Sequence, residues 1–311
     1  MSDPVDRALA RAAGYLVSIQ EPDGCWRDYH DRPVGPSDQW VTAYVALALS
    51  ELPPSVHCGA PDAGADWLLR NHCWAEGWGY NAHTGVDADS TAHAVLLLAA
   101  RDRRIPASCA VWLGERWHRD GGFATYPRAD AWGIGHPCVT PVVWEALVAA
   151  GHHEFDERAK VYLQRTMRSD GRWNAYWWRG TAYATSAALR ALARRNGVVP
   201  VRSSAPAADG AHGAHSAFEV ACEIATMCFR AQAIDADHEL LRSLLWRQRA
   251  DGSWPGADNL RLTAPECHAP WEHACGSRYV DWCGTITTAT CVRALNACLN
   301  ARRSDGQSTA D

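Results

Sequence analysis

A short pattern recurs five times along this chain and restricts its fold more than any other feature of the sequence. In each copy a pair of large hydrophobic residues precedes an acidic residue and a glycine, and an aromatic residue follows shortly after. A recurrence at this spacing indicates an array of similar supersecondary units. The longer gap before the last copy leaves room for a unit that has lost the pattern. The copies span Tyr15–Trp26, Trp67–Trp78, Trp112–Phe123, Tyr162–Trp173 and Leu244–Trp254.

Each unit is predicted to be a helical hairpin. A first, charged helix ends at the acid–Gly turn, where glycine adopts a positive φ without strain. A second helix follows a polar or aromatic loop and is rich in Ala, Leu, Val and Thr. Helices that are apolar on all sides lie inside a protein, whereas amphipathic helices lie at its surface. The predicted inner helices are 40–49, 89–100, 139–150, 182–193, 217–230 and 284–299.

Six inner helices and at least five outer ones predict a closed ring. An open array needs polar caps at its ends. Here the N-terminal helix is amphipathic and the last inner helix is apolar, which suits closure of the last unit on the first. The predicted fold is all-α, an (α/α)6 toroid (an alpha-alpha barrel) with one domain over residues 1–301. The Pro/Gly/Ala/Ser-rich segment 196–215 is predicted to replace the fifth outer helix with a loop, and 302–311 to form a disordered tail.

The composition limits the partners and the compartment. With 47% hydrophobic residues the 311-residue chain can form a large core, and its net charge of −5 gives no general attraction to nucleic acid. No apolar run approaches the roughly 20 residues of a membrane-spanning helix, and the N-terminus lacks the order of a signal peptide. A cytoplasmic monomer or homodimer without stable membrane insertion is expected. In that compartment the twelve cysteines are expected to stay reduced.

The stretch GVDADSTAHAVLLLAA places Asp87, Asp89 and Ser90 at the start of a predicted inner helix. Read alone, it is a helix cap, because Asp and Ser are preferred at N-caps and a carboxylate suits the positive end of a helix. In a ring the inner helices run parallel, so their N-terminal ends open on one face around a central cavity. A central cavity with aromatic walls and a few polar groups is the default ligand site. The motif is therefore a candidate acid site as well as a cap.

Two copies of the repeat, QEPDGCW and RQRADGSW, resemble the tryptophan-rich (QW-type) repeat of squalene-hopene cyclase and other class II terpenoid cyclases. The resemblance covers essentially the whole chain and implies a single β-type domain, without room for the second domain of full-size triterpene cyclases. The family carries D-x-D-D-T-A at the start of an inner helix. Asp87–Ala92 matches this motif except that Ser90 replaces an aspartate. The resemblance implies that Asp89 is the general acid that protonates an alkene or epoxide.

Protonation of an alkene requires a strong acid that is still protonated when the substrate arrives. The helix end strengthens the acid at Asp89, whereas a dry cavity and the neighbouring Asp87 raise its proton affinity. His93, one turn further along the same helix face, and His136, before the next inner helix, are candidate partners that hydrogen-bond to the acid or recharge it. A capping or surface role is the alternative for His136.

A carbocation needs walls that stabilise it without reacting, and aromatic faces do so through their quadrupoles. The candidates are aromatic residues in the loops after the turns or at inner-helix starts, because the repeat tryptophans are structural. For each candidate taken singly, packing in the core or at the rim is the alternative. The predicted substrate-binding residues are Trp40, Trp132, Trp177, Trp178, Tyr183, Trp271 and Trp282.

A loop near the C-terminus, residues 265–285, is rich in Cys and His. Asp281 and Cys283 resemble two zinc ligands of protein prenyltransferase β subunits, which share the toroid, and His273 is the candidate third ligand. In that family the third ligand lies on a later helix, which this sequence lacks, so a loop that merely covers the cavity is the alternative. The sequence contains no D-D-x-x-D motif for a magnesium cluster and no nucleotide-binding glycine pattern. No cofactor is therefore expected.

Together these features predict a class II terpenoid-cyclase-like enzyme. It protonates an alkene of a small isoprenoid or other unsaturated substrate and drives cyclisation or isomerisation. One alternative is a zinc-dependent transferase, which would lose its activity on chelation. The other is a non-catalytic toroid that binds a hydrophobic ligand and is indifferent to the loss of Asp89.

Overall fold

The computed structural model describes residues 3–73, 76–196, 215–232, 234–272 and 275–308, with only the backbone at 196 and 304–308. The inner helices are α2 (Gln39–Ser50), α5 (Ala88–Ala100), α7 (Thr140–Ala149), α9 (Ala182–Asn196), α10 (Ala217–Phe229) and α12 (Thr285–Ser308). The outer helices are α1 (Pro4–Ser18), α4 (Ala60–Arg70), α6 (Ala107–Gly114), α8 (Asp156–Thr166) and α11 (Glu239–Trp246), and the short α3 (Pro54–His57) precedes α4. The strands are β1 (Leu260–Leu262) and β2 (Ser277–Tyr279).

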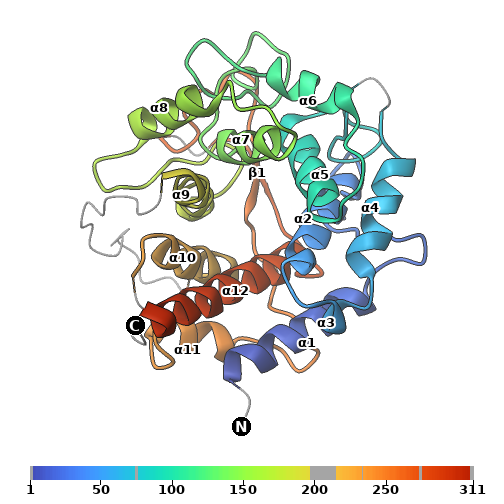
Figure 1. The fold of residues 1–311 in the computed structure, drawn as a ribbon. Coiled ribbons are helices and arrows are strands. Elements are labelled where there is room, and N and C mark those ends of the chain that lie inside the picture. Colours follow the sequence, from blue (N-terminus) through green and yellow to red (C-terminus); the bar gives the residue numbers. More distant parts are fainter. Residues whose placement is uncertain (1–2, 74–75, 197–214, 233, 273–274, 309–311) are drawn as a thin grey trace.

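The inner helices form a closed ring (Figure 1). Helix α2 contacts α5, α5 contacts α7, α7 contacts α9, and α9 contacts α10; α10 then contacts α12, which returns to α2. Helix α1 packs on α12 at the same seam, so the two ends of the chain meet there. The predicted all-α toroid is confirmed. Among the described helices none combines the length and the apolar character needed to cross a membrane.

Burial explains why the chain forms two kinds of helix. Every residue of α2 from Gln39 to Leu49 is buried, because this helix is surrounded on all sides. In the outer helix α8 only Ala159, Tyr162 and Leu163 are buried, and this spacing puts them on one face. The apolar inner helices thus fill the middle of the ring, and the amphipathic outer helices shield them from solvent.

The repeat forms the corner between an outer helix and the next inner helix. In all five copies the main-chain N–H of the last aromatic residue donates to a threonine hydroxyl on the inner helix. In four copies the indole N–H also donates to a leucine carbonyl ten residues earlier, in the outer helix. These pairs are Trp26 with Leu16, Trp78 with Leu68, Trp173 with Leu163, and Trp254 with Leu244. Each of these four corners is therefore bonded to both of its helices.

The turn of the first copy shows why the pattern contains glycine and glutamine. Gly24 has a φ of 105°, and a Cβ there would lie 2.7 Å from the Ala63 carbonyl oxygen. A left-handed backbone and so close an approach both require glycine. The Gln20 side chain donates to the carbonyls of Gly24 (2.8 Å) and Ala60 (3.0 Å). One glutamine thereby joins the turn after α1 to the start of α4.

The C-terminal helix is longer than the sequence predicted. Helix α12 continues to Ser308, so the predicted disordered tail is wrong for residues 302–308. The polar composition of this stretch gave no reason to expect order, but Arg302 donates to the Ile234 carbonyl (2.9 Å) and pairs with Asp3 (3.5 Å). The predicted loop in place of a fifth outer helix falls on 197–214, which lie outside the described residues.

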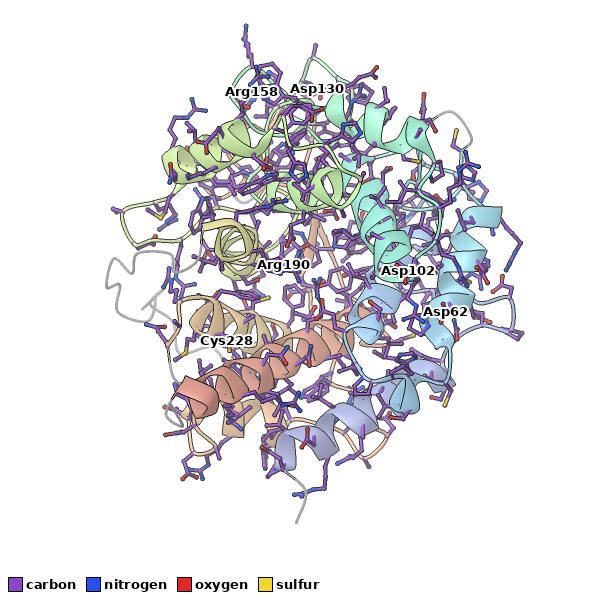
Figure 2. All side chains as sticks on the ribbon, viewed as in Figure 1. Asp62, Asp102, Asp130, Arg158, Arg190 and Cys228 are labelled. Atoms are coloured by element: carbon purple, nitrogen blue, oxygen red, sulfur yellow. A yellow bond between two sulfur atoms is a disulfide. The ribbon has the colours of Figure 1, made fainter. Side chains whose placement is uncertain are left out.

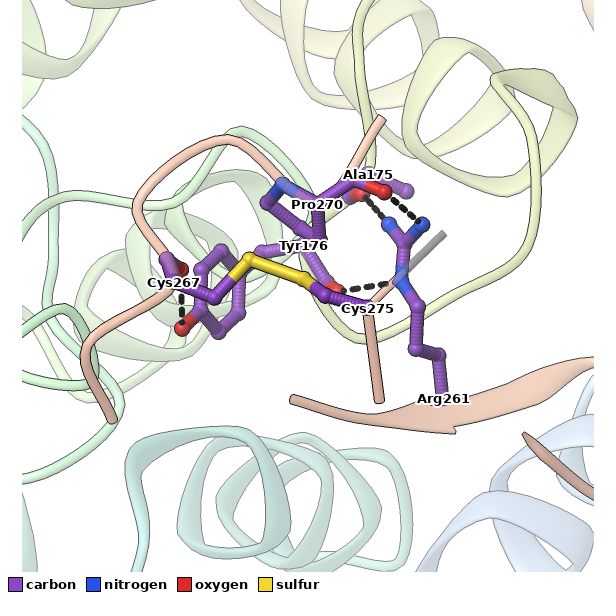
Figure 3. Close-up of a disulfide and its surroundings, with 6 residues drawn as sticks. All are labelled: Ala175, Tyr176, Arg261, Cys267, Pro270 and Cys275. Atoms are coloured by element: carbon purple, nitrogen blue, oxygen red, sulfur yellow. Dashed lines mark hydrogen bonds between the residues drawn. A yellow bond between two sulfur atoms is a disulfide. The ribbon is translucent and has the colours of Figure 1, made fainter. Parts of the chain in front are cut away.

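The expectation that all cysteines stay reduced is wrong for one pair. Cys267 and Cys275 form a disulfide in the loop between β1 and β2, whereas the other cysteines are free (Figure 3). The expectation rested on the compartment alone, and it ignored that two cysteines eight residues apart meet when their loop folds back. The Tyr176 hydroxyl donates to the Cys267 carbonyl (2.9 Å), so this loop is fixed to the segment before α9.

The strands β1 and β2 form an antiparallel hairpin near the N-terminal ends of the inner helices, with Leu260 opposite Tyr279. Leu260 also pairs with Trp178, just ahead of α9, and the Arg261 N–H donates to the Trp177 carbonyl (2.8 Å). In Figure 1 β1 is visible through the centre of the ring. The hairpin therefore lies beside the face on which the sequence places the candidate acid.

Candidate active site

Asp87 caps helix α5, and Ser90 is its partner. The Asp87 carboxylate accepts from the Ser90 N–H (2.8 Å) and from the Ser90 hydroxyl (2.7 Å). Burial raises the pKa of Asp87 to about 6, and the two Ser90 donors limit the rise. The capping role thus holds for Asp87. The serine at the family's aspartate position bonds to this cap and adds no charge beside Asp89.

Asp89 lies in the first turn of α5, and 15% of its side chain is exposed. Its Oδ1 is buried and accepts no hydrogen bond from any described residue. One turn further, Nδ1 of His93 is 2.9 Å from the Asp89 carbonyl oxygen and 3.7 Å from Oδ1. Since a carbonyl oxygen can only accept, this nitrogen carries the ring's proton. His93 therefore does not take the acid's proton through Nδ1.

The surroundings keep this acid protonated. Burial raises the pKa of Asp89 well above its ordinary value, the charge of Asp87 adds to the rise, and the Trp40 indole N–H opposes it. The indole N–H makes no hydrogen bond of normal geometry with a described residue, so it acts as a nearby dipole. Burial lowers the pKa of His93 to about 3. Burial thus favours the protonated form of Asp89 and keeps the neighbouring imidazole neutral at neutral pH.

A cavity of about 70 Å³ opens beside the Asp89 carboxyl group, and we call it the acid cavity. The exposed part of Asp89 faces this space, so the acid meets a small cavity instead of bulk water. The wall combines the polar groups of the motif with aromatic rings and two guanidinium groups. Its residues are Arg32, Trp40, Tyr80, Asp87, Asp89, Ser90, Thr125, Tyr126, Trp177, Trp178, Leu260, Arg261 and Leu262.

His136 fixes the wall of the acid cavity and does not contact Asp89. Its Nε2 is 2.9 Å from the Ala131 carbonyl oxygen, and its Nδ1 is 2.9 Å from the Thr125 hydroxyl. Burial lowers the pKa of His136 to about 4, so the ring is neutral and donates only through Nε2. Nδ1 accepts from Thr125, whose oxygen accepts from the Trp177 indole N–H (2.7 Å). The prediction of His136 as a partner of the acid is wrong, because this chain of bonds uses both of its nitrogens.

A larger space of about 530 Å³ lies between α2, α9, α10 and α12, and it reaches from Tyr183 near the start of α9 to Phe229 at the end of α10. We call it the large chamber. Arg190 donates to the Glu145 carboxylate (2.6 and 3.0 Å), and Arg194 donates to the same carboxylate (3.0 Å). Arg293 pairs with Glu51 (3.2 Å). Figure 2 labels two wall residues of this chamber, Arg190 on α9 and Cys228 on α10.

Four aromatic residues, which we call the aromatic partition, lie between the two spaces. Trp40 and Trp178 line the acid cavity, whereas Tyr44 and Tyr183 line the large chamber. The ring centroids are 4.0 Å apart for Trp178 and Tyr183, 6.0 Å for Trp40 and Tyr44, and 5.7 Å for Trp40 and Trp178. Only side chains therefore separate the acid from the larger space.

The geometry of the ring and the acid has counterparts in known proteins, although no family model matches the chain. The type II terpene cyclase MstE from Scytonema is similar with a TM-score of 0.80 and 26% identity, over 96% of this chain and 98% of MstE. A protein from Actinoplanes is similar with a TM-score of 0.81 and 30% identity, over 95% of this chain and 99% of that one. This chain is therefore similar to type II terpene cyclases in both fold and sequence.

A further relative of the chain is drimenyl diphosphate synthase from Streptomyces showdoensis, which is 34% identical over 171 residues, or 51% of this chain. The matched part is 30% of that protein's length, so the likeness concerns a part of it. Variants of MstE have been solved with geranylgeranyl dihydroxybenzoate, the MstE substrate, and with merosterolic acid A, the MstE product. These compounds belong to MstE, and the substrate of this chain is a separate question.

The predicted aromatic residues lie at different distances from the acid. Trp40, Trp177 and Trp178 line the acid cavity. Trp132 lies behind this wall, with its ring centroid 5.5 Å from that of Trp177. Trp132 therefore supports the wall without being part of it.

The prediction is wrong for the two tryptophans nearest the C-terminus. Trp271 is 42% exposed and Trp282 is 62% exposed, and neither lines the acid cavity or the large chamber. Their positions before an inner helix suggested the cavity, but the loop that carries them runs over the surface. Tyr183 lines the large chamber, on the other side of the aromatic partition from the acid.

Two arginines of the acid cavity were missed by the sequence analysis. The Arg32 guanidinium lies 4.0 Å from the centroid of the Tyr80 ring. Arg261 donates to the carbonyls of Ala175, Tyr176 and Pro270, which hold its charge at the edge of the cavity (Figure 3). Arg32 lies in the loop after the first repeat and Arg261 lies in β1, so neither is at the start of an inner helix, where candidate residues were sought. The Leu-Arg-Leu alternation at 260–262, which is typical of a strand, is the one local signal.

The residues predicted for zinc do not fit a metal ion. The Asp281 carboxylate accepts from the Ala257 N–H (2.7 Å), the Thr287 N–H (2.7 Å) and the Thr287 hydroxyl (3.1 Å). Asp281 is fully buried and fixes the start of α12, and among the described residues its carboxylate belongs to no group of three potential metal ligands. His273 lies outside the described residues. The zinc set of Asp281, Cys283 and His273 is therefore not supported.

Proposed function

We propose that this chain starts its reaction by transferring the Asp89 proton to an alkene carbon of an isoprenoid substrate. The observation that carries the proposal is a buried carboxyl group with a raised pKa in the wall of a small aromatic cavity. Protonation forms a C–H bond and leaves a carbocation on the substrate and a carboxylate on Asp89. A neighbouring double bond then attacks the cation, and loss of a proton ends the reaction, so the product is an isomer of the substrate.

The position of Asp89 also stabilises the carboxylate that it becomes. Asp89 lies in the first turn of α5, where the unpaired N–H groups of the helix give a partial positive charge. The dipole of the nearby Trp40 indole acts in the same direction. Both groups are in place before the reaction, so they favour the charge that develops during proton transfer. Burial and Asp87 keep the proton on the acid until the alkene arrives.

The aromatic wall suits the cation formed by protonation. Trp40, Trp177 and Trp178 line the same cavity as Asp89. Aromatic faces attract a cation without donating a nucleophilic lone pair. The His136–Thr125 bonds to the Trp177 indole keep one of these rings in a fixed orientation. The intermediate is thereby shielded from water, which would otherwise capture it as an alcohol.

The substrate chain fits the large chamber better than the acid cavity. Ligand sites usually enclose about 300–1,000 Å³, a range that includes the chamber of about 530 Å³ but not the cavity of about 70 Å³. The proposal therefore places the isoprenoid chain in the large chamber, with its terminal alkene passing the aromatic partition to reach Asp89. A polar or anionic head group would then lie near Arg194, whose side chain is 58% exposed. The substrate of MstE and the product of drimenyl diphosphate synthase both carry such a group.

The test is incubation with C10 to C20 isoprenoids, their diphosphates and geranylgeranyl dihydroxybenzoate in heavy water, followed by mass spectrometry. Turnover should give an isomer of the substrate in which one deuterium replaces one hydrogen, because the solvent-exchanged acid adds its isotope to carbon and the reaction ends with loss of a proton. The Asp89→Asn variant should give no product, since an amide cannot donate this proton. Turnover by that variant, or a product without deuterium, contradicts the proposal.

A further inference from the structure

Three potential metal ligands meet at the seam of the ring, and only one of them, Cys283, belongs to the predicted zinc set. Asp28 and His30 follow the first repeat, and Cys283 lies just before α12. A carboxylate oxygen, an imidazole nitrogen and the Cys283 Sγ all lie within 4.8 Å of one another. The fold therefore brings together an oxygen, a nitrogen and a sulfur ligand from opposite ends of the chain.

The backbone around these residues is fixed by several bonds. The Asp28 N–H and carbonyl both pair with Ser37 (3.2 and 2.9 Å). The Asp28 carboxylate accepts from the main-chain N–H groups of Tyr29 (2.7 Å) and Thr285 (3.1 Å). On the other side the Tyr15 hydroxyl donates to the Cys283 carbonyl (2.5 Å). The positions that carry the ligands are thus held in place by α1, the first repeat and the start of α12.

The residue between the two N-terminal ligands has an unusual backbone. Tyr29 has a φ of 59°, a left-handed conformation that is uncommon for a bulky residue and persists only where the surroundings hold it. Its ring is fully buried, and its hydroxyl donates to Asn259 Oδ1 (2.8 Å). Such local strain is concentrated at ligand sites in proteins. The bend at Tyr29 lies where the chain brings the Asp28 and His30 ligand atoms together.

We propose that Asp28, His30 and Cys283 bind one zinc ion. Zinc takes oxygen, nitrogen and sulfur ligands in a tetrahedron with bonds of roughly 2.0–2.3 Å, which puts ligand atoms about 3.3–3.8 Å apart. In the described structure no hydrogen bond or ion pair joins these three side chains to one another, and their ligand atoms already lie within 4.8 Å of one another. His30 and Cys283 are exposed, so the ion has a path of entry, and water takes the fourth position.

The proposed ion would bond the loop after the first repeat to the last inner helix. Helix α12 packs on both α1 and α2, so the ion would bridge the contact that closes the ring. A ligand that binds only the folded chain stabilises it, and removal of the ion should therefore lower the melting temperature. This site is independent of the proposed chemistry at Asp89, which needs no metal.

The test is metal analysis of the untagged full chain, purified from zinc-containing medium and dialysed to remove loosely held ions. Wild type should keep about one zinc ion per chain, and cobalt substitution should give a thiolate-to-cobalt charge-transfer band. His30→Ala and Cys283→Ser should lose the zinc, and Cys283→Ser should also lose the band. Cys58→Ser removes another exposed free thiol and should retain both.

Circular dichroism melting distinguishes loss of the site from loss of the fold. The two ligand variants should melt in one cooperative step, at the temperature of chelator-treated wild type. Asp89→Asn should bind zinc like wild type. Wild type that keeps no zinc after dialysis against zinc, or zinc retained by both ligand variants, overturns the proposal.

Discussion

The two ends of the ring differ in charge and in size. The acid cavity lies at the N-terminal ends of the inner helices, is small, and contains a buried carboxyl group with a raised pKa among indole rings. The large chamber extends further along the helices and contains arginines paired with Glu51 and Glu145. A helix N-terminus favours a developing carboxylate. The ring thus combines a place for proton donation at one end with a wider space, lined by paired charges, toward the other.

The largest expected effect is the loss of turnover when the carboxylic acid of Asp89 is replaced by an amide. Asp89→Asn should lower the rate by about 10²–10⁴-fold or more, the contribution of a general acid. Asp102→Asn is the matched control, because Asp102 is exposed on the outside of the ring and its left-handed φ of 50° suits asparagine equally well (Figure 2). Initial rates measured by mass spectrometry give both values, and equal losses in the two variants would refute a special role for Asp89.

The next largest effect concerns the buried ion pairs of the large chamber and their contribution to the free energy of unfolding. Glu145 is buried and neutralises Arg190 and Arg194, so Glu145→Gln leaves charged guanidinium groups without their counter-ion. The free energy of unfolding should fall by about 3–5 kcal/mol. The surface pair of Glu157 and Lys160 provides the control, since Glu157→Gln should change stability by less than about 1 kcal/mol. Urea unfolding measures both, and a small effect of Glu145→Gln would show that the large chamber tolerates an unpaired cation.

Removing the disulfide should affect the acid end alone. Closing a loop of this length contributes about 2 kcal/mol to stability, and the loop holds Tyr176 and Arg261 through the carbonyls of Cys267 and Pro270. The double variant Cys267→Ser, Cys275→Ser should therefore unfold at lower urea and lose turnover. Binding of an unreactive isoprenoid analogue in the large chamber should stay unchanged, and weaker binding there would contradict the separation of the two ends.

A smaller effect, on the product mixture, is expected from removing the hydrogen bonds that orient Trp177 in the wall of the acid cavity. Thr125→Val leaves the Trp177 indole N–H and the His136 Nδ1 without a partner, at a cost of about 1–2 kcal/mol. Trp177 should then change orientation, so the product mixture should contain more early-quenched or hydroxylated products. Thr166→Val, on the outer helix α8, is the control and should leave the product mixture as it is. An unchanged mixture in Thr125→Val would show that Trp177 does not guide the cation.

The smallest expected effect is on how stability depends on pH. Burial raises the folded-state pKa of Asp89 above 3.8, so the folded state keeps a proton that the unfolded state loses, and stability falls as the pH rises above that value. Asp89→Asn removes this dependence. The variant should be more stable than wild type at pH 8, and the difference should shrink toward pH 4. Urea unfolding at both pH values is the measurement, and a variant less stable at pH 8 would mean that Asp89 is ionised in the folded chain.

The sequence predicted the ring better than the wall of the acid cavity. The inner helices are visible in the sequence because burial on all sides leaves them uniformly apolar, as α2 shows. Asp89 was found because a motif and a helix start coincide. Arg261 and the Cys267–Cys275 disulfide belong to a loop that crosses back to the segment before α9. No periodic pattern marks such a contact, since it depends on how the hairpin β1–β2 lies against the ring.

The same limit explains why the predictions for some single residues were wrong. Trp282 and Trp178 both precede an inner helix, yet one is 62% exposed and the other is 2% exposed. Sequence position fixes the end of the ring at which a residue lies but not the direction of its side chain. His136 shows a related limit, because its two hydrogen bonds link it to Thr125 and Ala131 and leave nothing for Asp89. The large chamber gave no sequence signal, since its walls are ordinary Ala-rich helix faces with arginines.

The tryptophan bonds of the repeat bear on the order in which the chain folds. Each indole binds a carbonyl only ten residues earlier, so each corner is a local structure that forms from its own stretch of chain. Contacts of α12 with α1 and α2, in contrast, require the two ends of the polypeptide to meet. Ring closure should therefore be the slow step of folding. A circular permutant opened at another corner should transfer that step to a different pair of hairpins, which pulsed hydrogen exchange during refolding would detect.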